Sequence, residues 1–280
     1  LFFKKKILNY ILDLKRTTKR HNKVYFSRKF FYNPHSPIND LDTSNFGAIK
    51  KILQIKDGTV IDVGANIGIL GLELSRKHPT INIHSFEPVE DIYSVLKANT
   101  NLSNNKNFKS YNFGISDKNE SIEMIFFPNA PALSSSNDEI WNSKKDLIKA
   151  FDGSMQNAPS NWWWKKFIPK FTYSFFVKNL VRNKKKINCK LKPLSKVIEE
   201  LSLKKIDLLK IDCEGNEHKV INGINKENWS IIHQLIIEIN NIDGRLKYIE
   251  NKLKKLGFKI KIIQEPALEK TSLYNLFAKK

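Results

Sequence analysis

The chain has 280 residues, of which 41% are hydrophobic, 11% aromatic and 27% charged, and its formal net charge is +20. This length fits one large domain with extensions better than two full-sized domains, and no run approaches the roughly 18 apolar residues that span a bilayer. Two cysteines, Cys189 and Cys213, are too few for a disulfide framework and favour a reducing compartment, most simply the cytoplasm.

Basic residues gather in two places. Residues 1–30 carry many Lys and Arg side chains against a single acid, Asp13, and a second basic cluster covers residues 182–186. Both flank apolar residues at helical spacing, so two interpretations stay open: a helix on a membrane surface, and a solvated helix packed on the domain. We expect a cytoplasmic protein, with peripheral contact at the inner membrane face through the basic N-terminal arm as the alternative.

The hydrophobic pattern alternates between strands and helices from residue 58 onward. In chain order it predicts a strand at 59–65, a helix at 66–78, a strand at 81–87, a helix at 89–102 and a strand at 108–115. After a break it predicts a helix at 194–201, a strand at 205–212, a helix at 216–224, a strand at 231–240, a helix at 244–257 and strands at 258–263 and 272–279. Such βαβ units form a parallel sheet, and the last two strands predict an antiparallel hairpin at one edge.

The break and the N-terminal region lie outside this pattern. Turn residues mixed with aromatics predict an insertion at about 128–185, which we expect to form a lid or an acceptor site. We therefore divide the chain into a basic N-terminal helical extension at 1–57 and one α/β domain at 58–280.

A glycine-rich turn follows the first predicted strand. From Gly64 it reads GANIGI, so Asn66 and Ile69 replace the second and third glycines of a dinucleotide-binding turn. Because no lysine follows Gly68, the turn is not a phosphate-binding P-loop either. Glu87 ends the next strand, where a carboxylate can accept hydrogen bonds from both hydroxyls of a ribose. S-adenosyl-L-methionine has a ribose and no phosphate, so it suits this turn.

Five segments together resemble one family. VIDVGANIG, SFEPVED, NFGISDKNES, IDLLKIDCEGNEHKVINGI and LIIEIN stand in the order and spacing of the FkbM-type S-adenosylmethionine-dependent methyltransferases. The resemblance covers about residues 58–278 but neither the N-terminal arm nor the insertion. It implies the Rossmann-like α/β fold of class I methyltransferases, with a seven-stranded, mostly parallel sheet, an antiparallel last strand, and helices on both faces.

The resemblance also implies a cofactor site at the carboxyl ends of the first strands. The cofactor is S-adenosyl-L-methionine, and Glu87 is its ribose ligand. The implied cofactor-binding residues are Asp62, Gly64, Asn66, Gly68, Glu87, Ser116 and Asp117. Structural roles remain open for six of them: Asp62 as a cap, Gly64 and Gly68 as turn glycines, Glu87 as a carboxylate at a helix N-terminus, and Ser116 and Asp117 as turn residues.

The segment IDCEGNEH supplies candidate catalytic residues. Methyl transfer to a hydroxyl needs the acceptor oxygen in line with the methyl group, and it benefits from a base that removes the hydroxyl proton. Asp212 is the first candidate for this base, followed by Glu214 and His218. The alternatives are that Asp212 binds the amine of the cofactor and that Glu214 caps the next helix.

Three further residues are candidates for the acceptor side. Glu238 and Asn240 end the fifth strand. Trp163 belongs to a WWW run suited to stacking on a sugar ring, closing a lid, lying at a membrane interface or packing on the domain. Oxygen ligands from Asp212, Glu238 and Asn240 would suit Mg²⁺, but acceptor binding is the favoured role, so no metal is predicted.

These residues favour an S-adenosylmethionine-dependent O-methyltransferase that acts on a hydroxyl of a small molecule or glycan, with a sugar or glycolipid preferred. The charge of +20 suggests an RNA or DNA methyltransferase as an alternative. That alternative is disfavoured because IDCEGN stands where base-amine enzymes carry an N/D-P-P-Y/F motif. A non-catalytic basic domain that binds a membrane or a partner is the third reading, and the sequence predicts no oligomeric state.

Overall fold

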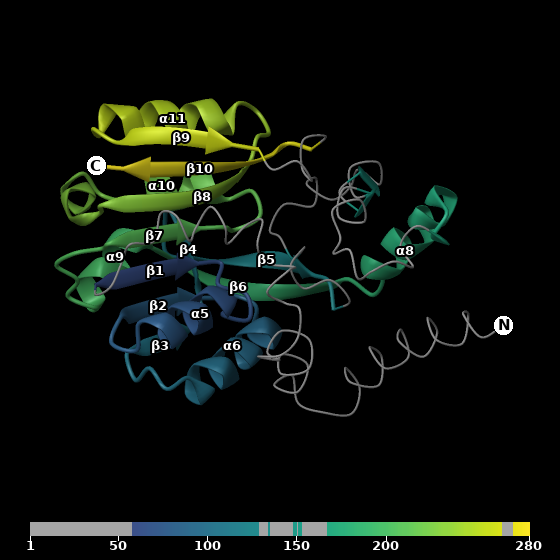
Figure 1. Ribbon diagram of the computed structural model, residues 1–280, viewed down its shortest axis with the longest axis horizontal. Helices are drawn as coiled ribbons and strands as arrows, with labels where there is room; N and C mark the ends of the chain where they lie inside the picture. Colours follow the sequence, from purple (N-terminus) through teal and green to yellow (C-terminus); the bar gives the residue numbers. More distant parts are fainter. Residues whose placement is uncertain (1–57, 129–133, 135–147, 150, 153–166, 265–270) are drawn as a thin grey trace.

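The computed structural model describes residues 58–128, 134, 148–149, 151–152, 167–264 and 271–280, drawn in colour in Figure 1. The predicted extension at 1–57 and most of the predicted insertion at 128–185, including Trp163, lie outside the described residues. Within the described part, none of the helices has the length and hydrophobicity that a membrane crossing requires.

A seven-stranded sheet lies at the centre of the described chain (Figure 1). In spatial order its strands are β3 (Phe108–Tyr111), β2 (Asn82–Phe86), β1 (Thr59–Val63), β7 (Leu208–Ile211), β8 (Gln234–Asn240), β10 (Leu273–Lys279) and β9 (Lys259–Ile263). β10 runs antiparallel to both of its neighbours, and every other pair in this sheet is parallel. The predicted mostly parallel sheet with an antiparallel last strand is confirmed, and β10 inserts between β8 and β9.

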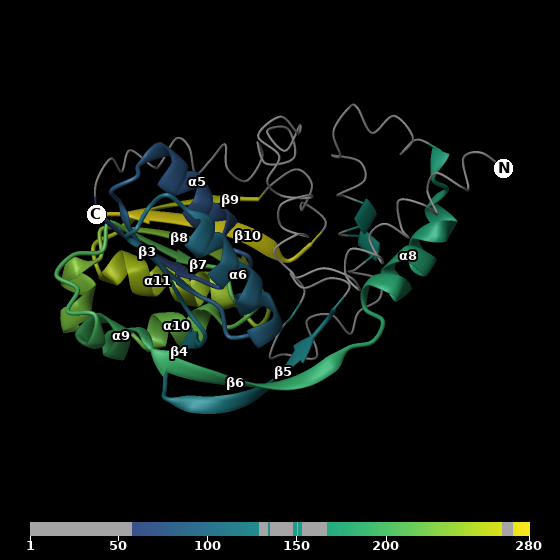
Figure 2. The same cartoon turned by 90° about the horizontal axis from the view of Figure 1, so that it is seen from below.

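Helices cover both faces of this sheet (Figure 2). One face carries α5 (Ile69–Lys77) and α6 (Glu90–Leu102), and the other carries α9 (Leu194–Glu200), α10 (Glu217–Asn222) and α11 (Arg245–Lys255). A short 3-10 helix, η4 (Glu227–Ile231), leads into β8. The predicted helices outside the insertion are therefore present, with ends within a few residues of the predicted bounds.

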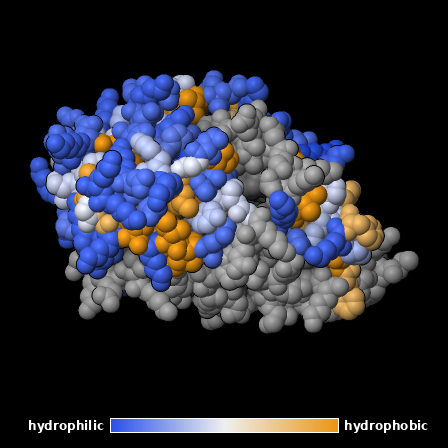
Figure 3. Space-filling model, turned by 90° about the horizontal axis from the view of Figure 1, so that it is seen from above, coloured by the Kyte–Doolittle hydropathy of each residue, from blue (hydrophilic) through white to orange (hydrophobic). Residues whose placement is uncertain are grey.

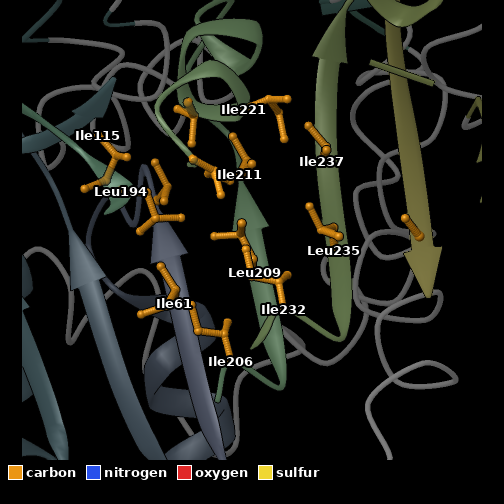
Figure 4. Close-up of a cluster of buried hydrophobic side chains, with 14 of the residues drawn as sticks. Ile61, Ile115, Leu194, Ile206, Leu209, Ile211, Ile221, Ile232, Leu235 and Ile237 are labelled. Carbon is orange, nitrogen blue, oxygen red and sulfur yellow. The ribbon is translucent and has the colours of Figure 1, made fainter. Parts of the chain in front are cut away.

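Isoleucine and leucine side chains fill the space between the sheet and α9, α10 and α11 (Figure 4). Successive residues of a strand point to opposite faces, so Ile61 and Leu209 pack here while Val60 and Leu208 pack beneath α5 and α6. All four are fully buried. Burying a side chain of this size contributes about 1.5–3 kcal/mol, which explains why the central strands are almost continuously apolar.

A second, three-stranded sheet was not predicted. Its order is β4 (Gly114–Ser116), β6 (Lys185–Pro193) and β5 (Glu120–Phe126), with β6 parallel to β4 and antiparallel to β5. The single strand predicted at 108–115 is wrong, because a bend at residues 112–113 divides it between the two sheets. The far end of β6 connects to η3 (Lys170–Thr172) and α8 (Tyr173–Leu180), which stand away from the seven-stranded sheet (Figure 2).

Candidate active site

The turn after β1 closes over the carboxyl ends of β2 and β7. The amides of Gly64 and Ala65 both donate to the carbonyl oxygen of Phe86, at 3.1 and 3.0 Å. Gly64 has a φ of +72°, and a Cβ at this position would lie 1.8 Å from the carbonyl oxygen of Asp212. The turn needs glycine because the backbone that leaves β7 passes directly against it.

Glu87, which follows β2, is a buried carboxyl group held by backbone donors. Its side chain is 6% exposed; Oε2 accepts the N–H of Asn66 at 3.1 Å, and Oε1 accepts the N–H of Val89 at 3.0 Å. Burial raises the pKa of Glu87 to about 7, and the two hydrogen bonds oppose this shift only in part. Peptide groups on both sides thus fix the orientation of this carboxyl group.

Lys210 in β7 lies between two carboxylates. Its Nζ is 3.4 Å from Asp62 Oδ1 and 3.1 Å from Asp212 Oδ2, and it donates to the carbonyl oxygen of Gly64 at 3.2 Å. Asp62 is fully buried, and burial raises its pKa although Lys210 opposes the shift. Burial alone would lower the pKa of Lys210, but Asp212 and Asp62 raise it above the ordinary lysine value. This ammonium group therefore stays charged and ties β1 to the end of β7.

Glu214 lies in the loop between β7 and α10. It is half-buried and has a positive φ of 49°. Burial, and then the carboxylates of Asp212 and Glu238, raise the pKa of Glu214 well above its usual value. This shift favours its protonated form, in which a carboxyl group donates a hydrogen bond.

Glu217, the first residue of α10, holds the same loop together with Arg245 of α11. Glu217 Oε1 accepts the N–H of Gly215 at 2.7 Å, and the guanidinium of Arg245 donates to the carbonyl oxygen of Gly215 at 2.6 Å. Glu217 is 1% exposed, and burial raises its pKa to about 7. Side chains from two helices thus fix the peptide groups on both sides of Gly215.

These elements surround a cavity of about 120 Å³ that opens to solvent. The predicted site residues that line it are Gly64, Asn66, Glu87, Ser116, Asp212 and Glu214. Another wall is apolar and comes from Val89 and Ile92 at α6, Ile122 and Met124 of β5, and Leu191 of β6. None of the described lining residues is Lys, Arg or His. The cavity therefore combines buried carboxyl groups with an uncharged apolar wall.

Three predicted cofactor-binding residues are not among the described residues that line the cavity. Asp62 is fully buried and paired with Lys210. Gly68 caps α5, and a Cβ there would lie 2.6 Å from Cδ1 of Leu96. Asp117 is exposed, and its Oδ1 accepts a hydrogen bond from Ser116 Oγ at 3.1 Å. Asp62 and Gly68 therefore have structural contacts within the fold: an ion pair with Lys210 for Asp62, and close packing against Leu96 for Gly68.

The remaining candidates lie in α10 and β8, also outside the described cavity lining. His218 is half-buried, and burial together with nearby cations lowers its pKa, which favours the neutral imidazole. Glu238 is half-buried in β8, and Asn240 at the end of this strand accepts a hydrogen bond from Ser272 Oγ at 2.5 Å. Among the residues that the structure describes, no three His, Cys, Asp or Glu side chains are placed to hold a metal ion together.

Residues 62–260, which include most of the residues that line the cavity, match the family model described as the methyltransferase FkbM domain. The chain belongs to the FkbM methyltransferase family. The resemblance drawn from five sequence segments is confirmed, and the protein is a methyltransferase.

Relatives of this FkbM-family chain match over most of its length. Methyltransferase 1 of Beauveria bassiana is 27% identical over 80% of this chain and 82% of its own length. The 31-O-demethyl-FK506 methyltransferase FkbM of Streptomyces tacrolimicus is 26% identical over 81% of this chain and 83% of its own length. Among solved structures, methyltransferase FkbM from Methylobacillus flagellatus KT has a TM-score of 0.50 and 12% identity. That match covers 98% of this chain and 60% of the other one, and it shows the shared fold.

Three polar residues of this FkbM-family site were not predicted from the sequence: Lys210, Glu217 and Arg245. Lys210 had a visible signal, since it interrupts the apolar strand segment IDLLKID, where a charged side chain needs a buried partner. Glu217 reads as an ordinary acid in the first turn of a helix, and Arg245 as an ordinary helix residue. Their contacts with Gly215 depend on how α10 and α11 pack, which no local pattern specifies.

Proposed function

We propose that this chain transfers a methyl group from S-adenosyl-L-methionine to a hydroxyl group of a small molecule or glycan. The observation that carries the proposal is the cavity in which buried Glu87 and partly buried Asp212 lie on either side of the turn at Gly64. Family membership supports methyl transfer, and the cavity supports the choice of donor.

The chemistry of the cavity suits an adenosine with a zwitterionic methionine tail. Glu87 can accept hydrogen bonds from ribose hydroxyls on the lone pairs that its two backbone donors leave. Val89, Ile122 and Leu191 offer an apolar surface for a purine ring. The described lining residues include no cation to neutralise a phosphate.

Bound S-adenosyl-L-methionine supplies an electrophilic methyl group on a sulfonium. Asp212 lines the cavity with a side chain 32% exposed, and it is our candidate for the base that takes the proton of the acceptor hydroxyl. The ion pair with Lys210 at 3.1 Å orients this carboxylate. Glu214, shifted toward its protonated form, suits hydrogen-bond donation to the acceptor better than proton abstraction.

We propose a sugar or a glycolipid as the acceptor. The name of one relative refers to 31-O-demethyl-FK506, a small molecule lacking a methyl group on an oxygen, which supports a hydroxyl as the accepting group. Ile92 and Met124 suit an apolar body next to the reacting hydroxyl. Incubation with a glycan and glycolipid panel and labelled donor tests this class; absence of methyl uptake by cofactor-bound protein would contradict it.

Calorimetric titration of S-adenosylmethionine and S-adenosylhomocysteine tests the cofactor. We expect the wild type to bind both and Glu87→Gln to bind about 10- to 100-fold more weakly, because a charged acceptor for the ribose hydroxyls is lost. Glu90→Gln is the matched control, since Glu90 is exposed on the first turn of α6. No binding by the folded wild type would contradict the cofactor, and unchanged binding by Glu87→Gln would contradict its ribose contact.

Single-turnover methylation by Asp212→Asn and Glu214→Gln separates the roles of the two carboxyl groups. A lost general base lowers the rate of transfer by about 10²- to 10⁴-fold, so we expect this loss for Asp212→Asn with cofactor affinity retained. For Glu214→Gln we expect a smaller effect, because the amide still donates a hydrogen bond. A parallel loss of cofactor affinity in Asp212→Asn would instead assign Asp212 to the amine of the cofactor.

A further inference from the structure

An exposed aromatic face lies on η3 and α8, outside the cavity. Phe167, Phe171 and Phe175 are 70%, 83% and 68% exposed, more than any other large hydrophobic side chain of the described residues. Figure 3 shows hydrophobic side chains beside hydrophilic ones at the end of the molecule that carries α8. A solvent-exposed patch of several large aromatic side chains indicates an interaction site.

The exposed and buried residues of this segment lie on different sides. η3 runs directly into α8, and Phe171, Phe175 and Lys178 are spaced at i, i+4 and i+7, which places them on one side of a helix. Tyr173 and Val177, which are 5% and 2% exposed, form the other side. The segment is thus anchored to the protein by one apolar side and presents a second apolar side to solvent.

Positive charge borders this aromatic face. Residues 167–190 include no Asp or Glu. Lys170 and Lys186 are paired with Asp152 and Glu123. Further exposed basic side chains on α8 and the segment that follows it are Lys178, Arg182, Lys184, Lys185 and Lys190. We refer to Phe167, Phe171, Phe175, Lys178, Arg182 and Lys184 as the α8 surface.

We propose that the α8 surface docks onto an anionic lipid bilayer. The phenylalanine rings enter the interface between headgroups and acyl chains, and the basic side chains contact lipid phosphates. Amphipathic helices that bind membrane surfaces combine these two groups, and attraction to anionic lipid adds to the affinity. α8 also stands away from the sheet at one end of the described chain (Figures 1 and 2), where a flat bilayer can approach it.

A nucleic acid is the less suitable occupant of this surface. Proteins that stack bases on aromatic side chains do so along a basic groove that follows the strand. Phe171 and Phe175 instead lie on an outward-facing helix side, with exposed Phe167 just before η3, and none of the three lines the cavity. Charge complementarity and shape together therefore favour lipid.

Docking through this surface would bring the cavity close to the membrane. β6 runs from Lys185, just after α8, to Leu191, which lines the cavity. Six strand residues (191 minus 185) span about 20 Å. A glycolipid anchored in the same bilayer could then present its hydroxyl groups to the cavity. Only this last step rests on the proposed function, since the docking itself does not require it.

Flotation of the full chain with vesicles tests the proposal. We expect binding to vesicles of phosphatidylcholine mixed with phosphatidylglycerol and much weaker binding to phosphatidylcholine alone. Phe171→Ser/Phe175→Ser is expected to weaken binding by about tenfold or more. Lys178→Gln/Arg182→Gln is expected to weaken it by about fivefold for each charge removed.

Matched controls alter exposed residues of the same kinds elsewhere. Leu102→Ser on α6 and Lys255→Gln/Lys259→Gln at α11 and β9 are expected to keep wild-type binding. Circular dichroism checks the folding of each variant. Undiminished vesicle binding by both α8 variants, or no binding of the wild type to mixed vesicles, would overturn the proposal. Preferential binding of an RNA oligonucleotide through the same side chains would also overturn the proposal. Since no readout here involves S-adenosylmethionine, failure of docking is distinguishable from failure of the proposed cofactor.

Discussion

The two sides of the cavity hold their buried acids in different ways. At the end of β2, Glu87 is compensated by the backbone N–H groups of Asn66 and Val89. At the end of β7, Lys210 compensates Asp212, and it also compensates Asp62 of the neighbouring strand β1. The backbone donors of Asn66 and Val89 are kept in every substitution except proline, whereas any substitution of Lys210 by an uncharged residue removes the ammonium group. Changes at Glu87 should therefore alter binding more than folding, and changes around β7 should alter folding as well.

The largest expected effect follows from removing Lys210. Lys210→Met leaves fully buried Asp62 and partly buried Asp212 without their shared cation, and breaking such a buried pair costs about 3–5 kcal/mol of unfolding free energy. Lys205→Met is the matched control, because Lys205 forms an ion pair with Asp207 at 2.6 Å but is 58% exposed. Removing an exposed pair costs about 1 kcal/mol or less. Urea unfolding of both variants measures the difference.

A double variant sharpens this comparison. Lys210→Met leaves the carboxylates of Asp62 and Asp212 without a cation, and the double variant Lys210→Met/Asp62→Asn removes one of these two charges. It is therefore expected to recover part of the lost stability. Equal costs for Lys210→Met and Lys205→Met would mean that burial of the Lys210 pairs contributes little, and the contrast between the two sides of the cavity would then disappear.

The next effect concerns the pH dependence of stability through Glu217. Burial raises its pKa from 4.5 to about 7, so between these values the folded protein holds a proton that the unfolded chain has released. The free energy of unfolding therefore falls as pH rises through this window, by about 3 kcal/mol for this group. Glu217→Gln should remove this share of the dependence in urea titrations at several pH values, while Glu87 retains its own share.

Glu227→Gln serves as the control for this pH series. Glu227 is exposed in η4, so its substitution is expected to leave the wild-type dependence in place. A pH dependence of full wild-type size in Glu217→Gln would show that Glu217 does not hold this proton.

The seven-stranded sheet was predictable because both of its faces are buried, which leaves long apolar runs and helical periodicity in the sequence. Glu87, Gly64 and Asp212 were predicted to lie together, since each stands near the carboxyl end of a predicted strand, and all three line the cavity. The three-stranded sheet was missed although β6 alternates, with Ile187, Cys189 and Leu191 on one side. Its partner β5 lies more than 50 residues earlier in the chain, before the insertion. No local hydrophobic pattern therefore indicates that the two strands pair.

The α8 surface and the loop after β7 illustrate two other limits of prediction. FTYSFF gives no sign of which aromatic side chains point inward, because every position is compatible with burial. Glu217 and Arg245 meet at Gly215 only after α10 and α11 pack side by side. Both features depend on tertiary contacts between segments whose local patterns are ordinary.

The smallest expected difference tests whether the turn at Gly64 is set by backbone contact rather than by φ alone. Gly64 and Gly244 have nearly equal φ values of +72° and +75°, so alanine at either position carries a similar left-handed strain of about 1–2 kcal/mol. A Cβ at Gly244 meets nothing within 4 Å, whereas one at Gly64 would lie 1.8 Å from the carbonyl oxygen of Asp212. Gly64→Ala must therefore displace the end of β7 and should lose about 1–3 kcal/mol more than Gly244→Ala in urea unfolding. The same displacement moves Asp212, so cofactor affinity should fall in Gly64→Ala and not in Gly244→Ala. Equal stabilities and equal affinities of the two variants would mean that the ends of β1 and β7 adjust without cost. The close approach of Gly64 to Asp212 would then not position the site.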